Sequence, residues 1–317
     1  MRSIKEKENA MRIKVIINPK SKNGNHKDLK TMLEEKFSHS LAGIEQTTYP
    51  KHATEIAQRA VRENVDAIVA VGGDGTINEV LNGIAGTDVA LGIIPTGTAN
   101  DLATFYGIPK DPTKACQVIL NQNVSCADLI RVNNRYYVTS GGLGFPSDVV
   151  GIASWMKHQN MIGKLLGQLM GSKIYILALL CALIKKSKRE NFLKVRWNGS
   201  SLYADSLSLL LNNQPFLGKN LLMSPGALNN DGRFDVCLIG NPKSRLRVLS
   251  ILLKVLTGKH VYFSSVSRWL ADKLVVTSER PLAFFGDGEI ICQGTYFNLQ
   301  IIPKALKIIV PAKEERS

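Results

Sequence analysis

The chain has 317 residues, enough for one large domain or two ordinary ones, and with 44% hydrophobic and 21% charged residues its composition is that of a globular protein. Its formal net charge of +14 predicts an anionic partner, which a nucleotide, a membrane surface or a nucleic acid would each provide. Its five cysteines form no CxxC pair, so we expect a reducing compartment and exclude a disulfide framework and a zinc site.

The N-terminal part of the chain is predicted to alternate strands with helices. Residues 1–10 are charged and lack the apolar stretch of a secretory signal, so we expect a disordered leader there. Strands are then expected at 11–17, 43–50, 66–72 and 89–95, and helices at 26–40, 54–63, 77–86 and 101–107. Thr54 is the expected N-cap of the second helix. Because the strands are apolar rather than alternating, they predict a parallel sheet covered by helices on both faces.

Three loops follow strands of this predicted sheet: NPKSKNG (18–24), GGDGT (72–76) and PTGTAND (95–101). They are expected at the carboxyl ends of the strands, where ligands bind in such sheets. The glycines would adopt positive φ angles and bring main-chain N–H groups close to phosphate oxygens, helped by the dipole of the next helix. Asp74 would repel a bare anion, which predicts hydrated Mg²⁺ as an intermediary.

A simpler interpretation of GGDG alone is a tight strand-to-helix turn with an Asp cap. The second loop repeats the same Gly, Thr and Asp pattern one strand later, which favours a ligand site. Neither loop has the spacing of a P-loop or of a GxGxxG dinucleotide fingerprint.

From about Ser125 the sequence changes to strand-like segments joined by turn pairs such as Asn198-Gly199, which predicts a second, mainly antiparallel β domain. Helical passages at 152–186 and 243–258 interrupt it. The longest apolar stretch, 174–184, is far shorter than the roughly 20 residues of a spanning helix. The expected domains are 11–124 and 125–317, with the extreme C-terminal segment packing back on the first.

Four motifs in the same order, INPKSKNG, GGDGTINEVLNGI, GIIPTGTANDLA and FFGDGE, resemble those of the diacylglycerol kinase catalytic domain family. The resemblance extends from about Met11 to Pro311. The family includes bacterial soluble diacylglycerol and related lipid kinases, sphingosine kinases and ceramide kinases. The resemblance implies an α/β nucleotide-binding domain like that of NAD kinases and phosphofructokinases, a C-terminal β-sandwich domain, and ATP in the cleft between them.

The resemblance also implies functional residues. The nucleotide contacts would lie in the three loops and after the second strand, at Asn18, Pro19, Lys20, Ser21, Lys22, Thr47 or Thr48, Gly73, Asp74, Gly75, Thr76, Ile77, Asn78, Glu79, Thr98, Asn100 and Asp101. Asp74 would organise catalytic Mg²⁺ through water. Glu289 of the DGE motif would be the general base, with Asp287 beside it, because the attacking hydroxyl must lose its proton. Without the upstream motifs, DGE would more simply be an Asp-Gly hairpin turn.

Two weaker assignments complete the implied site. Asp128 corresponds to an acidic position that the family places near the γ-phosphate. Residues 224–236 resemble the segment that holds a structural Mg²⁺ in bacterial members, through the Asp231 side chain and the main-chain oxygens of Leu228 and Arg233. Asn230 stands where many members have Asp, which weakens the predicted affinity for the ion.

The sequence therefore predicts an ATP- and Mg²⁺-dependent lipid kinase that phosphorylates a hydroxyl of diacylglycerol or a similar lipid. We expect it in the cytoplasm, meeting its lipid at the membrane surface, with a homodimer left open. Residues 163–184 are either a lid or acyl-chain pocket or a buried core helix, and 243–260 either a membrane-binding or a surface helix. The alternatives are an NAD kinase-like enzyme and a non-catalytic nucleotide- or membrane-binding module. A nucleic-acid partner is not expected, because the 7% aromatic residues do not interleave with the basic ones.

Overall fold

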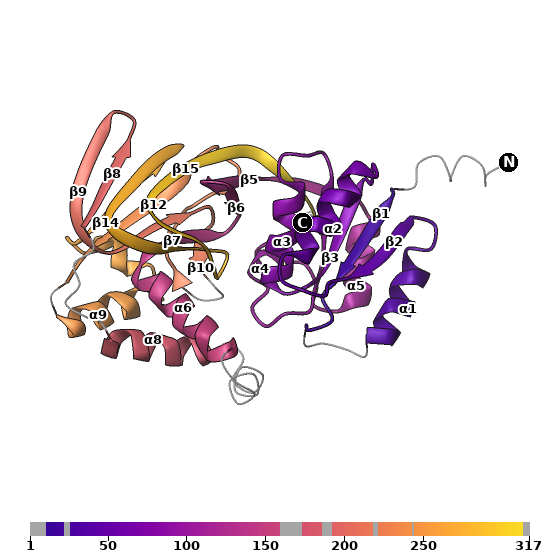
Figure 1. Cartoon of the computed structure of the whole chain (residues 1–317), viewed down its shortest axis with the longest axis horizontal. Helices are drawn as coiled ribbons and strands as arrows, with labels where there is room; N and C mark the ends of the chain where they lie inside the picture. The colour runs from indigo at the N-terminus through magenta and orange to yellow at the C-terminus, as the bar shows by residue number, and fades with distance from the viewer. Residues whose placement is uncertain are drawn as a thin grey trace, which may run out of the picture. The chain divides into compact units, whose positions relative to one another are not determined.

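A computed structural model describes residues 11–21, 26–158, 173–185, 192–217, 221–242 and 244–312. The chain divides into two compact units. The first consists of Met1–Ala127 with Lys304–Ser317, and the second of Asp128–Pro303. Figure 1 labels the helices and strands of both. The predicted leader lies outside the described residues.

A parallel sheet forms the centre of the first unit. Its strands are β1 (Ile13–Ile17), β2 (Leu41–Gln46), β3 (Ala67–Gly72) and β4 (Ala90–Pro95). They lie in the order β4-β3-β1-β2, and every neighbouring pair is parallel. All residues of β1, β3 and β4 are buried, which explains their mainly apolar sequences; Lys14 of β1 is the charged exception and pairs with Glu45. The predicted parallel sheet is therefore present.

The C-terminal strand returns to this sheet. Strand β15 (Glu289–Ile309) begins in the second unit, and its residues Lys307 and Ile308 pair in parallel with Ala90 and Leu91 of β4. A second strand, β5 (Val124–Val132), also has residues in both units and pairs with β15.

Five described helices belong to the first unit: α1 (His26–Lys36), α2 (His52–Arg62), α3 (Asp74–Ile84), α4 (Asp101–Phe105) and α5 (Pro112–Leu120). Helices α2 and α3 contact each other, and α3 and α5 contact the sheet. The predicted N-cap of α2 is wrong. The helix starts two residues earlier, after Lys51 in the left-handed region (φ 70°), and the Thr54 hydroxyl donates to the Glu79 carbonyl instead (2.8 Å).

The second unit is rich in antiparallel strands, as predicted. They are β6 (Arg135–Tyr137), β7 (Ser140–Gly144), β8 (Phe192–Trp197), β9 (Ser200–Asn212), β10 (Phe216–Leu217), β11 (Leu221–Leu222), β12 (Phe234–Gly240), β13 (Val266–Ala271) and β14 (Lys273–Gly286). The order β13-β12-β9-β7-β14-β15 is antiparallel at every step. Tyr137, Phe284 and Phe297 pack ring against ring in a core on one side of it.

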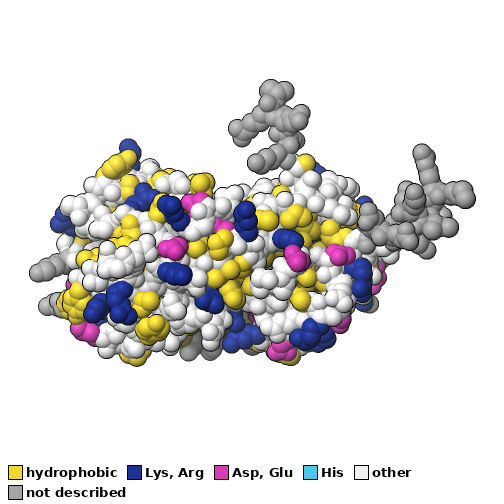
Figure 2. Space-filling model, turned by 90° about the horizontal axis from the view of Figure 1, so that it is seen from above, with side chains coloured by type: hydrophobic (Ala, Val, Ile, Leu, Met, Phe, Trp, Pro, Cys, Tyr) yellow, Lys and Arg dark blue, Asp and Glu magenta, His cyan; other side chains and the backbone are white. Residues whose placement is uncertain are grey.

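Three helices, α6 (Phe145–His158), α8 (Lys173–Lys185) and α9 (Arg245–Val255), pack over a second core in this unit, followed by a short 3-10 helix, η1 (Lys259–Tyr262). Part of the helical passage predicted at 152–186 lies outside the described residues, at 159–172. Among the helices that the structure describes, none has the length and hydropathy to cross a membrane. Lys and Arg side chains are distributed over the face shown in Figure 2, with Asp and Glu among them.

Candidate functional site

The loops after β3 and β4 are in close backbone contact at Gly73 and Gly97. A Cβ atom on Gly97 would lie 2.4 Å from the Cα of Gly73, and a Cβ on Gly72 would lie 2.5 Å from that of Thr76. Gly73 has a φ angle of −94°. Gly72, Gly75 and Gly97 are also absent from the described residues that have a positive φ angle. The predicted positive φ angles are therefore wrong at these positions. The glycines are needed because two backbones and a side chain approach one another too closely for a Cβ.

The Asp74 carboxylate joins the same two loops. Its Oδ2 accepts the backbone N–H of Asn100 (2.9 Å) and its Oδ1 that of Asp101 (2.7 Å), where α4 begins. Asn100 is left-handed (φ 53°), and its own side chain accepts from and donates to the Gly97 backbone (3.0 and 2.8 Å). A carboxylate from one loop thus satisfies N–H groups at the first turn of the next helix.

The loop after β1 is bonded to this pair. The Asn18 Nδ2 donates to the hydroxyl of Thr76 (2.9 Å), and the Asn18 N–H donates to the Val71 carbonyl (3.0 Å). The Asn18 Oδ1 accepts the Lys20 N–H (3.0 Å) and its carbonyl accepts the Ser21 hydroxyl (2.8 Å). All three predicted loops therefore meet at the carboxyl edge of the sheet. Lys22 lies outside the described residues.

Glu79 and the two threonines after β2 are held at the start of α2. The Glu79 carboxylate accepts the N–H groups of Lys51 (2.8 Å) and Ala53 (3.2 Å), a favourable place for an anion at a helix N-terminus. The Thr47 N–H donates to the β1 carbonyl of Ile17 (2.9 Å), and the Thr48 N–H donates to His52 Nδ1 (3.2 Å).

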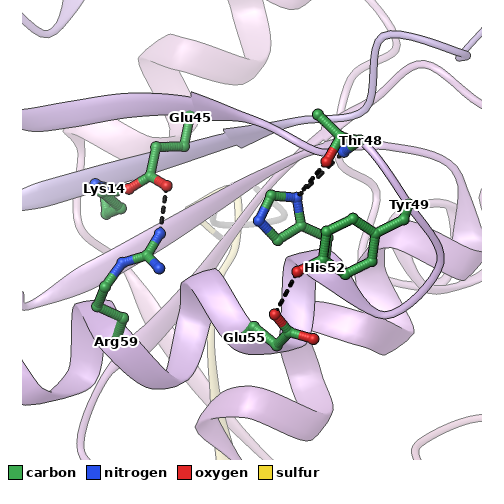
Figure 3. A network of polar contacts seen from close by, with 7 residues as sticks. All are labelled: Lys14, Glu45, Thr48, Tyr49, His52, Glu55 and Arg59. Carbon is green, nitrogen blue, oxygen red and sulfur yellow. Dashed lines mark hydrogen bonds and ion pairs between the residues drawn. The ribbon is translucent and has the colours of Figure 1, made fainter.

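Figure 3 shows the polar network around this helix start. The rings of Tyr49 and His52 stack at 4.3 Å, and the Tyr49 hydroxyl donates to Glu55 (2.5 Å). Farther along the helix, Glu45 is paired with Lys14 and Arg59. Burial acts to raise the pKa of Glu45, but these two cations hold it below its usual value. The network fixes Thr48 at the edge where the three loops meet.

The predicted nucleotide contacts differ in accessibility. The side chains of Ile77 and Asn78 are buried in α3, whereas those of Lys20, Thr48 and Thr98 are exposed. Gly73, the N-cap of α3, is partly exposed and has no side chain to bond the first-turn N–H groups of the helix. A ligand at this edge would therefore meet main chain at 73–75 and the three exposed side chains. Their roles as nucleotide contacts remain predictions.

In the second unit, the DGE motif forms the hairpin between β14 and β15. Gly286 pairs with Glu289, and the two residues between them, Asp287 (φ 51°) and Gly288 (φ 80°), have the positive φ angles of a type I′ turn. The simpler interpretation of the motif as a turn is thus correct as to geometry. It leaves the Glu289 side chain exposed at the first position of β15.

Asp287 fastens this turn to the segment between β6 and β7. Its carboxylate accepts the N–H of Val138 (3.2 Å) and the N–H and hydroxyl of Thr139 (2.8 and 2.7 Å). Its own N–H donates to the Ser140 carbonyl (3.0 Å). Burial, with a smaller contribution from the negative charge of Asp287, raises the pKa of Tyr137 well above its usual value. The bonds of Asp287 hold the turn after which Glu289 begins β15.

Asn213, which was not among the predicted residues, connects this segment to Asp128. Its side chain is fully buried, and its Nδ2 donates to the carbonyls of Asp128 (2.7 Å) and Val138 (3.1 Å), while its N–H donates to Thr139 (2.8 Å). Asp128 is itself fully buried, and its carboxylate accepts the Gly232 N–H (2.7 Å). The sequence signal was the pair of amides that ends the apolar strand SLLLNN.

The resemblance implies two magnesium positions, at Asp74 and in the loop around Asp231. The Asp74 oxygens accept the main-chain N–H groups of Asn100 and Asp101, and a carboxylate held in this way is of the chemical type that contacts a metal-bound water. Asp231 is exposed and accepts the N–H of Arg233 (3.0 Å), so the loop from Leu228 supplies one carboxylate. The described residues contain no group of three or more His, Cys, Asp or Glu that could hold a metal ion. Magnesium at Asp231 remains a prediction.

Two family models match the chain: diacylglycerol kinase catalytic domain over residues 12–132, and YegS C-terminal NAD kinase beta sandwich-like domain over 160–310. A diacylglycerol kinase of Bacillus subtilis (strain 168) is 28% identical over 315 residues, covering 96% of this chain and 97% of the relative. A "Probable lipid kinase YegS-like" of Alcanivorax borkumensis is 29% identical, covering 80% and 83%. The crystal structure of a diacylglycerol kinase from Bacillus anthracis superposes with a TM-score of 0.72 at 19% identity, over 96% and 98% of the chains.

The contact between Gly73 and Gly97 predicts that Gly97→Ala destabilises the first unit. The added Cβ would overlap Gly73, and overpacking of this kind costs about 1–3 kcal/mol in the free energy of unfolding. Thermal unfolding measures the loss. Gly151→Ala is the matched control, because a Cβ at that helical position meets nothing within 4 Å. Equal melting temperatures for the two variants would contradict the close approach.

Asp74→Asn is expected to loosen the joined loops. An amide offers one acceptor oxygen to two N–H groups, and leaving one of them unsatisfied costs about 1–3 kcal/mol. Hydrogen exchange at Asn100 and Asp101, followed by mass spectrometry, should become faster. The control is Asp88→Asn, whose side chain is 99% exposed in its ion pair with Lys307 and which should leave that exchange unchanged.

Asp287→Asn is expected to lower kcat by about 10²-fold while the KM for ATP changes little, because a slight displacement of Glu289 suffices for such a loss. Steady-state kinetics with lipid acceptor separate the two constants. Asp272→Asn, an exposed acid at the other end of β14, serves as the control. A variant that raised only the KM for ATP would show that Asp287 acts on nucleotide binding and not on the turn.

Proposed function

The chain belongs to the diacylglycerol kinase catalytic domain family and is a kinase enzyme, and from this premise we propose that it transfers the γ-phosphate of ATP to a hydroxyl of diacylglycerol or a similar lipid, with Mg²⁺. The observation that carries the proposal is the meeting of three loops at one sheet edge, within the region matched by the catalytic-domain model. With it we propose the finer fold assignment, an NAD kinase-like first domain and a β-sandwich second domain, and a cytoplasmic location.

The joined loops are proposed to bind the phosphate groups of ATP. The first turn of α3 has N–H groups and a positive dipole end near Gly73, which favour an anion. Exposed Lys20 adds a positive charge, and Thr48 and Thr98 add hydroxyl donors. Magnesium, when bound with the nucleotide, neutralises charge on the phosphate oxygens, and Asp74 would hold one of its water ligands.

Glu289 is proposed as the general base. As the lipid oxygen bonds to the γ-phosphorus, the bond from that phosphorus to the β-phosphate oxygen breaks and ADP leaves. The lipid hydroxyl loses its proton to the Glu289 carboxylate, which its place beside a rigid two-residue turn holds in one orientation. The proposed nucleotide contacts lie in the first unit and Glu289 lies in the second.

A pocket in the second unit is proposed to take the acyl part of the lipid. Its volume is about 700 Å³, within the usual range for small-molecule sites. Apolar side chains of α6, α8, β9, β14 and β15 line much of it, among them Phe145, Leu207, Leu282 and Ile290. Ile290 directly follows Glu289 in the chain. The proposed acyl site therefore includes a residue of β15, the strand that begins with the proposed base.

Glu289→Gln is expected to reduce phosphate transfer by about 10²–10⁴-fold while ATP still binds, because the amide cannot accept the proton. Transfer from radiolabelled ATP to extracted lipids, with mass spectrometry of the product, measures turnover, and calorimetry measures ATP binding. Glu279→Gln, an exposed glutamate on β14, is the control and should retain activity. Normal turnover in the Glu289 variant would remove that residue from its role, and formation of NADP from NAD would overturn the choice of acceptor.

A further inference from the structure

Helix α9 has two apolar faces, although a helix that covers a sheet needs one. The inner face buries Val248, Ile251 and Val255 in the core of the second unit. The outer face, opposite to it at helical spacing, carries leucines with the exposed fractions Leu246 79%, Leu249 41%, Leu253 58% and Leu256 51%. Such a stripe of exposed leucine is costly in water unless something covers it.

Helix α8 repeats this arrangement in the same unit. Leu177, Leu180 and Ile184 lie on one side and are 40%, 50% and 72% exposed, while Ala178 and Ala182 on the other side are buried. Ala182 belongs to the same core cluster as the inner face of α9. Both helices cover the same side of this unit's strands (Figure 1), so two exposed apolar stripes occur on one side of the unit.

The net charge of the chain comes almost wholly from the two segments that contain these helices. Residues 149–189 and 236–271 together contain 13 Lys or Arg and no Asp or Glu, and the rest of the chain contains 27 basic and 26 acidic residues. On α9, exposed Arg245, Arg247 and Lys254 flank the leucine stripe. An apolar stripe flanked by cations, in a segment without acidic residues, is complementary to an anionic lipid surface.

The helices are too short to cross a bilayer. Helix α8 has 13 residues, about 20 Å at 1.5 Å per residue, against a hydrocarbon core of about 30 Å. We propose that the outer faces of α8 and α9, the α8–α9 face, dock on an anionic bilayer with both helices lying in its interface. The inference deepens the proposed function, on which it rests, by naming the surface that meets the lipid: Ala182 of α8 also lines the proposed acyl pocket.

Co-sedimentation with vesicles tests the proposal without ATP or turnover. Vesicles of phosphatidylcholine and phosphatidylglycerol in equal parts are compared with vesicles of phosphatidylcholine alone. The wild-type chain is expected to sediment with the mixed vesicles, less so at high salt, because exposed charges are screened. Leu249→Ser with Leu253→Ser should lower the partition coefficient at least about tenfold. Arg245→Gln with Arg247→Gln should lower it by a similar factor on mixed vesicles alone.

The control variant is Tyr296→Ser, a 52% exposed side chain on β15 of the same unit, which should bind as the wild type does. Equal binding by the leucine variant and the wild type would overturn the proposal, as would a wild type that stays in the supernatant. Sedimentation velocity without vesicles tests the alternative occupant of the α8–α9 face, a second copy of the chain. A dimer that Leu253→Ser dissociates, with no vesicle binding, would assign the face to a second copy of the chain.

A short-chain diacylglycerol dispersed in detergent separates this inference from the proposed function. If the chain phosphorylates that lipid but does not bind vesicles, the result contradicts only the docking of the α8–α9 face on a bilayer. Vesicle binding without phosphorylation of any lipid would contradict the proposed function and leave the docking face in place. Unchanged activity of the leucine variant on the dispersed lipid would show that it is folded, because neither leucine belongs to the proposed active site.

Discussion

Three loops meet at the carboxyl edge of the first unit's sheet, which we call the proposed nucleotide edge. This edge depends on one carboxylate that is shared between two of the loops. Asp74 starts α3 and accepts the first N–H groups of α4, so neither loop can move without breaking bonds to the other. The arrangement requires the backbones at Gly73 and Gly97 to touch, and only glycine permits that distance. A buried Asn100 completes the loop from within. The edge is therefore rigid before any ligand arrives, which is the condition for positioning phosphates without loss of conformational entropy on binding.

The second unit uses the same device for Glu289. Asp287 accepts N–H and O–H groups from the segment before β7, and Asn213 bonds that segment to Asp128. Because Asn213 is fully buried, each hydrogen bond that it makes is costly to break. As the proposed general base, Glu289 has to be accessible, so its orientation must come from its neighbours and not from its own burial. Here the neighbours are a tight turn and a buried amide.

The sequence was sufficient for what depends on local periodicity and on the ends of apolar strands. Unbroken apolar strands predicted the parallel sheet, and turn pairs predicted the antiparallel strands after residue 125. The sequence was insufficient where a residue's conformation or role depends on a contact with a residue far away in the chain. Thr54 looked like a helix cap, but Glu79 supplies the cap. The glycines suggested positive φ, but it is contact with the next loop that excludes a side chain. Asn213 matters through residues 75 and 85 positions away, which no spacing rule relates to it.

Net charge is a weak guide until its location is known. Averaged over the chain, +14 fits any anion, and the proposed nucleotide edge accounts for little of it. Along the sequence, the excess lies in the segments that contain α8 and α9. The inner faces of these helices pack in the core of the second unit, and their outer leucines are exposed. A phosphate site needs a few charges at fixed positions, whereas a lipid surface attracts many cations without fixing any. The distribution therefore distinguishes the two proposed anionic partners, which the total could not: a nucleotide, recognised by the geometry of the loops, and a bilayer, attracted by charge and held by apolar contact.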